Sequence, residues 1–311
     1  MYLITGGAGF IGNNITREAL GRGIKVRILD NFSTGHWANL VDIRDDVEII
    51  EGDIRSYHIV RSAMEGVEVV FHQAALPSVP RSIADPITTN EVNVQGTLNI
   101  LHAALDAGCR RVLFASSSSI YGDAPEQVKT ESLHVRPLSP YAVSKLAGEK
   151  YMQVFHHIYG LETVALRYFN VFGPYQDPDS PYSAVIPLFI RACMEGHSPV
   201  INGDGQQSRD FTYIANVVHA NLLAADAEAA PGTMMNIACG DSITINHLAS
   251  DIGRLTGRND IEPSHGPQRP GDVKYSRADI TLAGELLGYE PVVSFKEGLE
   301  DTVSFMREHW M

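Results

Sequence analysis

The chain has 311 residues, 44% hydrophobic and 20% charged, which is enough to bury a sizeable core in one large domain or two unequal ones. Its 24 Lys and Arg residues against 37 Asp and Glu residues give a net charge of −13, the wrong sign for binding phosphates along a nucleic acid or an anionic membrane. We therefore expect neither as a partner.

The cysteines and the N-terminal residues indicate a cellular compartment. Cys109, Cys193 and Cys239 form no CxxC pair, and an odd number argues against a disulfide framework. No window holds 18 uncharged apolar residues, and Met1–Thr5 runs directly into a glycine-rich turn, leaving no room for a signal peptide. The histidines lack metal-ligand spacing. We expect a cytoplasmic protein with no membrane span and no metal site.

Short apolar or β-branched runs alternate with longer amphipathic stretches through roughly the first 170 residues. This alternation is typical of a parallel sheet with crossover helices. Each run is apolar enough to be covered on both faces. Strands are expected at Tyr2–Thr5, Lys25–Leu29, Val47–Glu51, Val67–Phe71, Arg111–Ala115 and Thr163–Arg167.

The intervening stretches carry apolar residues at a spacing of three to four, which predicts helices. Gly23, Gly108 and Gly160 lie where helix ends are expected. After about residue 170, closely spaced prolines and glycines indicate a smaller, loop-rich mixed α/β lobe. The helices of the first part are expected at Phe10–Gly21, Thr88–Ala107 and Pro140–Tyr159.

A glycine-rich motif follows the first expected strand and opens the first expected helix. Gly6, Gly7, Gly9 and Gly12 satisfy both GxxGxxG and GxGxxG, which lets the backbone turn tightly and approach a pyrophosphate. Asp30 ends the next strand, where a carboxylate binds both ribose hydroxyls and repels the additional phosphate of NADP. We therefore favour NAD in an α/β, Rossmann-like, doubly wound parallel sheet.

Two further features carry chemistry. Tyr141 and Lys145 are four residues apart on one helix, so their side chains share a face. A nearby ammonium and a nicotinamide cation favour the phenolate, which would make Tyr141 a base at neutral pH. The run Ser116–Ser119 follows the fifth strand, at the sheet edge where ligands bind, and a hydroxyl there could bind a sugar and relay a proton to Tyr141.

Together these motifs resemble the extended short-chain dehydrogenase/reductase superfamily and, within it, the NAD-dependent UDP-sugar 4-epimerases. The resemblance covers nearly the whole chain. The matching stretches are TGGAGFIG at 5–12, LDNF at 29–32, GDI at 52–54, HQAA at 72–75, NVQGT at 93–97, SSSSIYG at 116–122, SPYAVSK at 139–145, LRYFNVFG at 166–173, SRD at 208–210 and RPGD at 269–272.

The resemblance implies an NAD-binding domain over residues 1–170, to which some later segments return, and a mainly UDP-sugar-binding lobe over residues 171–311. It implies Ser117, Tyr141 and Lys145 as catalytic residues. The residues that it implies around NAD are Gly6, Gly9, Phe10, Ile11, Gly12, Asp30, Asn31, Ser33, Thr34, Gly35, Asp53, Ile54, Gln73, Ala74, Ala75, Asn93, Ser116, Tyr141, Lys145 and Tyr168.

The same resemblance implies a substrate site in which UDP is held firmly and the sugar loosely, because a site that grips one epimer would prevent the sugar from turning over. Ser276 occupies a position where relatives restricted to glucose and galactose resemble one another in carrying a bulky Tyr. A small residue there leaves room for an N-acetyl group. Pro77 departs from the Gly expected in this wall. The implied substrate residues are Ser78, Ser117, Ser118, Ser119, Asn170, Gln176, Ala184, Val185, Asn202, Arg209, Arg269, Asp272 and Ser276.

The sequence therefore predicts a UDP-hexose 4-epimerase that accepts N-acetylhexosamines as well as glucose and galactose. An enzyme limited to UDP-glucose and UDP-galactose remains an alternative, as does a UDP-glucuronate 4-epimerase or decarboxylase, for which no cation is clearly assigned to the C6 carboxylate. A 4,6-dehydratase is disfavoured because Ser118 and Ser119 replace the expected acid and base.

A catalytically inactive dinucleotide-sensing protein is a further alternative, although both Tyr141 and Lys145 are present. The resemblance also implies a homodimer that pairs through helices over residues 88–107 and 140–159, and the periodicity permits such a contact.

Overall fold

A computed structural model describes residues 1–179, 184–268 and 274–309. Its centre is a sheet of seven parallel strands in the order β12-β7-β5-β4-β1-β2-β3. Six of them confirm predicted strands, with some ends displaced by one or two residues, and the unpredicted β12 joins the edge from much later in the chain. The bounds are β1 (Tyr2–Thr5), β2 (Val26–Asp30), β3 (Val47–Glu51), β4 (Val69–His72), β5 (Arg111–Ser117), β7 (Glu162–Tyr168) and β12 (Thr233–Ile237).

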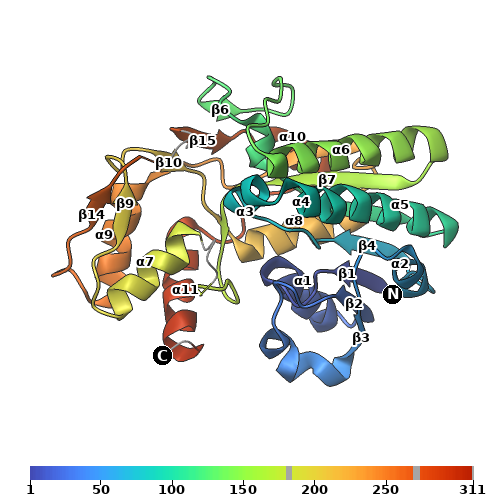
Figure 1. Ribbon diagram of the computed structural model, residues 1–311, viewed down its shortest axis with the longest axis horizontal. Helices are drawn as coiled ribbons and strands as arrows, with labels where there is room; N and C mark the ends of the chain where they lie inside the picture. The colour runs from blue at the N-terminus through green and yellow to red at the C-terminus, as the bar shows by residue number, and fades with distance from the viewer. Residues whose placement is uncertain (180–183, 269–273, 310–311) are drawn as a thin grey trace.

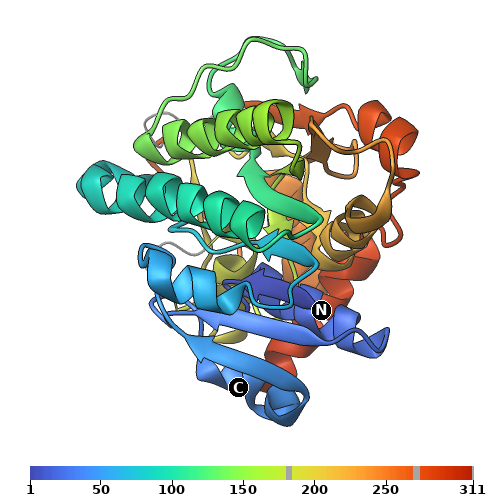
Figure 2. The ribbon, with the colours of Figure 1, turned by 90° about the vertical axis from the view of Figure 1, so that its right-hand side faces the viewer.

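Helices cover both faces of this sheet, as Figures 1 and 2 show. Successive strand residues alternate between the faces, so Leu3 joins one apolar core and Ile4 the other. The core around Leu3 includes side chains of α2, α5 and α6, whereas the core around Ile4 includes side chains of α1 and α8. The predicted doubly wound α/β fold is confirmed. These helices are α1 (Phe10–Gly21), α2 (Tyr57–Ala63), α5 (Gly96–Asp106), α6 (Pro140–Tyr159) and α8 (Ile214–Asp226).

The helix predicted over Thr88–Ala107 is confirmed, but it is not α-helical throughout. The chain forms α3 (Val79–Ala84), α4 (Pro86–Asn90), a π-helical turn η2 (Glu91–Gln95) and only then α5. Apolar spacing alone does not distinguish a π turn from an α turn, because the change lies in the backbone hydrogen-bond register. The predicted helix ends at Gly23, Gly108 and Gly160 coincide with positive φ angles of 74°, 68° and 72°.

The remaining elements gather mainly at the end of the sheet toward which its strands run (Figure 1). Among them are a four-stranded mixed sheet, in the order β13-β10-β15-β6, and the two-stranded pairs β11-β8 and β14-β9. The bounds are η1 (Trp37–Asp46), η3 (Ser118–Tyr121), β6 (Val128–Lys129), β8 (Val171–Phe172), α7 (Val185–Met194), β9 (Val200–Asn202), β10 (Ser208–Arg209), β11 (Thr212–Tyr213), β13 (Ile243–Thr244), α9 (Ile245–Thr256), β14 (Ser264–Gly266), β15 (Tyr275–Ala278), α10 (Thr281–Leu287) and α11 (Phe295–His309).

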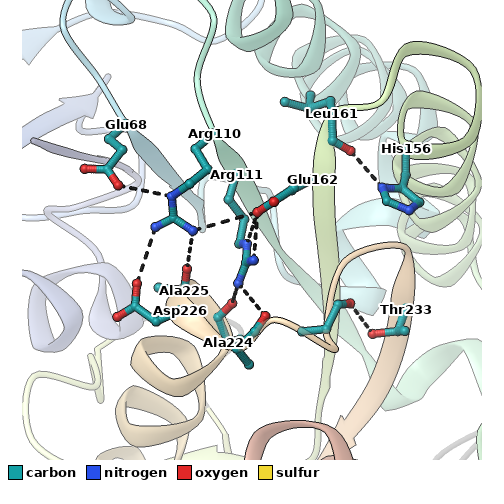
Figure 3. A network of polar contacts seen from close by, with 12 residues as sticks. Glu68, Arg110, Arg111, His156, Leu161, Glu162, Ala224, Ala225, Asp226 and Thr233 are labelled. Carbon is teal, nitrogen blue, oxygen red and sulfur yellow. Dashed lines mark hydrogen bonds and ion pairs between the residues drawn. The ribbon is translucent and has the colours of Figure 1, made fainter.

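Two arginines lie at the opposite, amino end of the central strands (Figure 3). The buried Arg111 guanidinium donates to Glu162 Oε2 at 2.8 Å and to the carbonyls of Ala224 and Ala227 at 2.7 and 2.9 Å. Its neighbour Arg110 reaches the Ala225 carbonyl at 3.0 Å. Positive charge at the end of α8 is favourable because the last carbonyls of a helix lack partners within it. The pair therefore ties α8 to the start of β5 and β7.

Over the ranges that the structure describes, no helix combines the length and apolarity needed to cross a membrane. Within those same ranges, no group of three or more His, Cys, Asp and Glu side chains is arranged to hold a metal ion.

Candidate active site

A cleft of about 1190 Å³ opens at the carboxyl edge of the central sheet. Its walls come from the turn between β1 and α1, the ends of β2, β4 and β5, the start of α6 and loops of the second half of the chain. Ligand pockets for one small molecule usually measure about 300–1,000 Å³. The cleft is therefore large enough for more than one small ligand.

The glycine motif shapes one end of the cleft. Gly6 has a φ angle of 70°, and a Cβ atom on Gly12 would lie only 2.2 Å from the Gly6 carbonyl oxygen. Side chains at these positions would disrupt the turn. Gly9 is the N-cap of α1 and supplies no side-chain cap, so N–H groups of the first turn remain available to an anion. This backbone fits a pyrophosphate.

Carboxylates follow β2 and β3 along the same wall. Asp30 accepts hydrogen bonds from the N–H groups of Ala8 and Phe32 at 2.9 and 2.8 Å. Burial raises the pKa of Asp30, and these backbone hydrogen bonds act in the opposite direction. The Arg55 guanidinium is the main reason why the pKa of Asp53 falls to about 2, and Asn31 donates to the same carboxylate at 2.9 Å. Both carboxylates line the cleft, where a ribose or an adenine could meet them.

Most residues predicted around the cofactor lie in the cleft wall. Asn93 does not line it; its buried amide binds the Leu76 main chain and the Ser144 hydroxyl, which fixes the turn after β4. Lys145 also lies behind the wall. The predicted residues that do line the cleft are Gly6, Gly9, Phe10, Ile11, Gly12, Asp30, Asn31, Ser33, Thr34, Gly35, Asp53, Ile54, Gln73, Ala74, Ala75, Ser116, Tyr141 and Tyr168.

Tyr141 lies in the first turn of α6, which begins with a cap by the Ser139 hydroxyl and with Pro140. Ser117 ends β5 and also lines the cleft. Burial raises the pKa of Tyr141, and a hydrogen bond with the Ser117 side chain acts to lower it. Both side chains line the cleft, where a proton relay between their hydroxyls requires them to lie side by side.

Lys145 lies one turn further along α6 with its ammonium nitrogen 5.9 Å from the Tyr141 ring centre and 4.9 Å from that of Phe114. It donates to the Ala115 carbonyl at 2.7 Å, and burial lowers its pKa to about 7. The sequence predicts that this ammonium and a nicotinamide cation together favour the phenolate of Tyr141. Burial of Tyr141 and Lys145 acts against both charged forms.

Several predicted substrate residues come together in the cleft from distant parts of the chain. Ser119 Oγ and Gln176 Oε1 are buried and have no hydrogen-bond partner among the described residues. The Gln176 amide nitrogen donates to the Val171 carbonyl at 3.2 Å, which leaves the oxygen as the open acceptor. The predicted substrate residues that line the cleft are Ser78, Ser117, Ser118, Ser119, Asn170, Gln176, Ala184, Arg209 and Ser276.

Two predicted substrate residues that the structure describes, Val185 and Asn202, are not among the cleft-lining residues. Val185 begins α7 and directly follows the cleft residue Ala184. Asn202 pairs with Gly266 between β9 and β14. Arg269 and Asp272 lie outside the described residues.

The cleft also contains residues that motif spacing did not identify. Arg81 and Lys129 are cations from short elements, and Tyr175 and Asp177 belong to a proline-rich loop. Loops carry no periodicity from which to locate a side chain, so only their place after LRYFNVFG could have indicated them. Tyr175 packs under Arg17 of α1 at 4.6 Å from ring centre to guanidinium carbon, which holds this loop against the glycine-rich half.

Comparisons with known proteins agree with this geometry. A UDP-glucose 4-epimerase of Mycolicibacterium smegmatis is 38% identical, with 98% of each chain covered. The solved UDP-N-acetylglucosamine 4-epimerase of Methanobrevibacter ruminantium, in complex with UDP-N-acetylmuramic acid, is 41% identical with a TM-score of 0.94, covering 99% of this chain and 98% of that one. A Thermus thermophilus UDP-glucose 4-epimerase in complex with NAD is 35% identical with a TM-score of 0.90, covering 99% of both chains.

The sequence model of the NAD dependent epimerase/dehydratase family matches residues 2–238, which span both the glycine motif and the Tyr141–Lys145 pair. The cofactor is NAD, as the cradle at Gly6–Gly12 and the carboxylate of Asp30 predict. The chain belongs to the NAD-dependent epimerase/dehydratase family.

Proposed function

We propose that this protein is a UDP-hexose 4-epimerase that accepts UDP-N-acetylglucosamine and UDP-N-acetylgalactosamine as well as UDP-glucose and UDP-galactose. The observation that carries the proposal is that Ser117 and Tyr141 line the same cleft as the dinucleotide cradle. Both hydroxyls lie at the carboxyl edge of the sheet, where α/β folds bind their ligands. Fold alone would not select this reaction.

The side chains have separate roles in the proposed reaction. The Gly6–Gly12 turn and Asp30 would hold NAD, which would supply a hydride acceptor for C4 of the sugar and a donor for its return to the opposite face. Tyr141 accepts the proton of the C4 hydroxyl, with Ser117 as relay, and donates it back after the keto sugar has turned. Lys145 lies one turn from Tyr141 and is anchored by the Ala115 carbonyl, and its ammonium form favours the phenolate. Arg209 lines the cleft and is suited to the diphosphate, whose anchoring lets the sugar turn without leaving.

The sugar end of the cleft supports the N-acetylated substrates. Ser276 on β15 lines it with a small side chain. The unpartnered atoms Ser119 Oγ and Gln176 Oε1 offer a hydroxyl and an acceptor to a polar substituent. Buried polar atoms without partners are costly, so a ligand that supplies hydrogen bonds would offset the cost.

The direct test is incubation of purified protein with UDP-N-acetylglucosamine and no added NAD, followed by separation of the products. We expect UDP-N-acetylgalactosamine to form, because the cofactor is regenerated in each turnover. A parallel incubation with UDP-glucose measures the ratio of the two rates. A protein with bound NAD that converts UDP-glucose alone would limit the function to glucose and galactose, and conversion of neither would refute it.

A uronate substrate is the second candidate. Arg81 on α3 lines the cleft close in sequence to Ser78, and so supplies a cation that the sequence alone did not assign to a C6 carboxylate. UDP-glucuronate belongs in the same assay, with Arg81→Met as the matched variant. Conversion of UDP-glucuronate that is lost in this variant would favour the second candidate.

The assembly that we propose is a homodimer. Val143, Val154 and Ile158 form an exposed apolar stripe on α6, with exposed fractions of 52%, 43% and 63%. A second copy packed against this stripe would cover it. Light scattering with size-exclusion chromatography should give a mass of two chains, and Ile158→Asp should reduce it to one. A wild-type mass of one chain would exclude the dimer. We expect the cytoplasm as its compartment.

A further inference from the structure

Helix α6 carries a third inward-facing polar residue beyond Tyr141 and Lys145. Glu149 lies four residues after Lys145, so the three side chains share one face of the helix. Its side chain has 0% exposure. Glutamate is almost never fully buried unless it is paired. The proposed reaction assigns no role to this carboxylate.

Glu149 is held by two strands at once. Arg167 of β7 donates to its two oxygens at 2.8 and 2.9 Å in a forked pair, and Ser116 of β5 donates to Oε1 at 2.5 Å. Burial acts to lower the pKa of Arg167, but Glu149 and Tyr121 outweigh it, and the pKa is raised. Forked pairs fix geometry as well as charge. The carboxylate therefore fixes α6 against the carboxyl end of β5, at the residue that precedes Ser117.

The contacts continue from Arg167 toward the sugar end of the cleft. Arg167 donates to the Tyr121 hydroxyl at 2.8 Å, and Tyr121 donates to Asn236 Oδ1 at 2.7 Å. The Asn236 amide then donates to the carbonyls of Lys129 and Asp279 at 2.9 and 3.1 Å. Lys129 ends β6, which pairs with β15, the strand that carries Ser276.

We propose that Glu149 and Arg167 are positioning residues that hold Tyr141 against Ser117 and connect this pair, through Tyr121 and Asn236, to the strand bearing Ser276. The inference rests on the proposed epimerase function for its kinetic test only. A buried ion pair adds little net stability over an apolar pair of similar size. Its charges and hydrogen bonds can nevertheless specify a single packing of the elements that carry them. Misplacement of a reacting group by 1 Å can cost about 100-fold in rate.

The chain offers a matched control on the same two strands. Arg111 and Glu162 face each other in the β5–β7 register at the amino edge, whereas Ser116 and Arg167 face each other at the carboxyl edge. Glu162→Gln therefore breaks an Arg–Glu contact on the same strands, but far along them from the cleft. Because Glu162 is 37% exposed and Glu149 is 0% exposed, the two variants are compared in kcat and not in the size of their stability loss.

The variants are purified with NAD, and rates are expressed per molecule of bound NAD. We expect Glu149→Gln to lower kcat for UDP-glucose about 100-fold with KM changed by no more than about threefold. The double variant Glu149→Leu with Arg167→Met, which leaves no unpaired buried charge, should show the same loss. Glu162→Gln should lower the melting temperature and keep the wild-type kcat. A double variant with wild-type kcat would overturn the proposal.

A readout that needs no sugar separates this proposal from the epimerase function. The chain has 12 tyrosines, so absorbance titration at 295 nm is compared between each variant and its Tyr141→Phe partner to isolate Tyr141. The double variant Glu149→Leu with Arg167→Met removes one charge of each sign, so it tests position and not net charge. Without the hydrogen bond to Ser117, the ionisation of Tyr141 should move to higher pH in this double variant but not in Glu162→Gln. Unchanged ionisation in the double variant would overturn the positioning role, even if no UDP-sugar is converted.

Tyr121→Phe tests the connection to Ser276, because it removes only the hydroxyl that joins Arg167 to Asn236. We expect the ratio of the KM values for UDP-N-acetylglucosamine and UDP-glucose to change at least about threefold. An unchanged ratio would overturn this part of the proposal.

Discussion

The neighbouring strands β5 and β7 carry two buried arginines, Arg111 at the amino edge of the sheet and Arg167 near the carboxyl edge. The two arginines have different surroundings. At the amino edge, Arg111 binds Glu162 and closes the end of α8 (Figure 3). At the carboxyl edge, Arg167 holds Glu149 beneath a cleft in which Ser119 Oγ and Gln176 Oε1 lack partners among the described residues. At the amino edge the Arg111 guanidinium is satisfied by protein groups, whereas at the carboxyl edge a hydroxyl and an amide oxygen in the cleft wall stay open to a ligand. Changes at the two edges should therefore affect different properties.

The largest effect is expected from Tyr141→Phe, which removes the proposed base without changing the packing of its ring. The epimerisation rate should fall at least about 1,000-fold, since a positioned acid or base contributes 10²–10⁴ in rate. Product formation from UDP-glucose measures it. Bound NAD and the urea midpoint should stay close to wild type. A loss below tenfold would contradict the assignment of Tyr141.

Arg111→Met should produce the opposite result at the amino edge. It removes the contacts to Glu162 and to the last carbonyls of α8, so the free energy of unfolding should fall by about 2 to 3 kcal/mol. Urea denaturation measures the change. The kcat of the folded protein should remain within about twofold of wild type. A large loss of kcat would show that the amino edge of the sheet also affects catalysis at the carboxyl edge.

Ser276→Tyr sharpens the comparison within the carboxyl edge. The larger ring would occupy space at the sugar end of the cleft, so we expect kcat/KM for UDP-N-acetylglucosamine to fall about 50- to 100-fold, equivalent to about 2.5 kcal/mol. The rate with UDP-glucose should fall less than fivefold. Ser276→Ala is the control for the hydroxyl itself. Equal loss for both substrates in Ser276→Tyr would contradict the proposal that the small side chain at position 276 makes room for the N-acetyl group.

The smallest expected effect concerns acid stability at the carboxyl end of β4. His72 is fully buried and lies between the hydroxyls of Thr5 and Thr97 at 2.8 and 3.0 Å. Thr97 donates its own proton to the Asn93 carbonyl, so the contacts fit neutral His72 with its proton on Nε2. Burial, and secondarily the charge of Lys145, lowers the pKa of His72 to about 3.

A lowered pKa means that the stabilisation is present above the ordinary value of 6.5 and is lost as the pH falls toward 3. Between pH 8 and pH 5 the wild type should therefore lose about 2 kcal/mol from this group, as measured by urea unfolding. His72→Gln should reduce this loss, and His58→Gln on the exposed surface should not. An identical pH dependence in His72→Gln and wild type would contradict the prediction.

The sequence predicts well the features that repeat or that have fixed spacing. Six strands, the first helix and the helix bearing Tyr141 could be predicted because apolar periodicity and glycine ends determine them locally. The dinucleotide cradle follows from the position of Gly6–Gly12 between a strand and a helix. The role of Asp30 follows from its place at the end of the next strand.

Features that depend on distant contacts could not be predicted in the same way. The π turn around Asn93 depends on hydrogen bonds to Leu76 and Ser144, which no local pattern specifies. The upward pKa of Tyr141 depends on burial that outweighs a hydrogen bond. Arg81 reaches the cleft from a short helix, which no local pattern of the sequence indicates.

The place of β12 at the edge of the central sheet has a consequence during synthesis. Residues 233–237 pair with β7, and α8, which precedes them, packs against α1. A nascent chain that has emerged only to residue 170 would still expose the backbone of β7 and the apolar face of α1. The glycine-rich half therefore cannot mature as an early, separate unit on the ribosome, and we expect truncation products that end before residue 233 to aggregate.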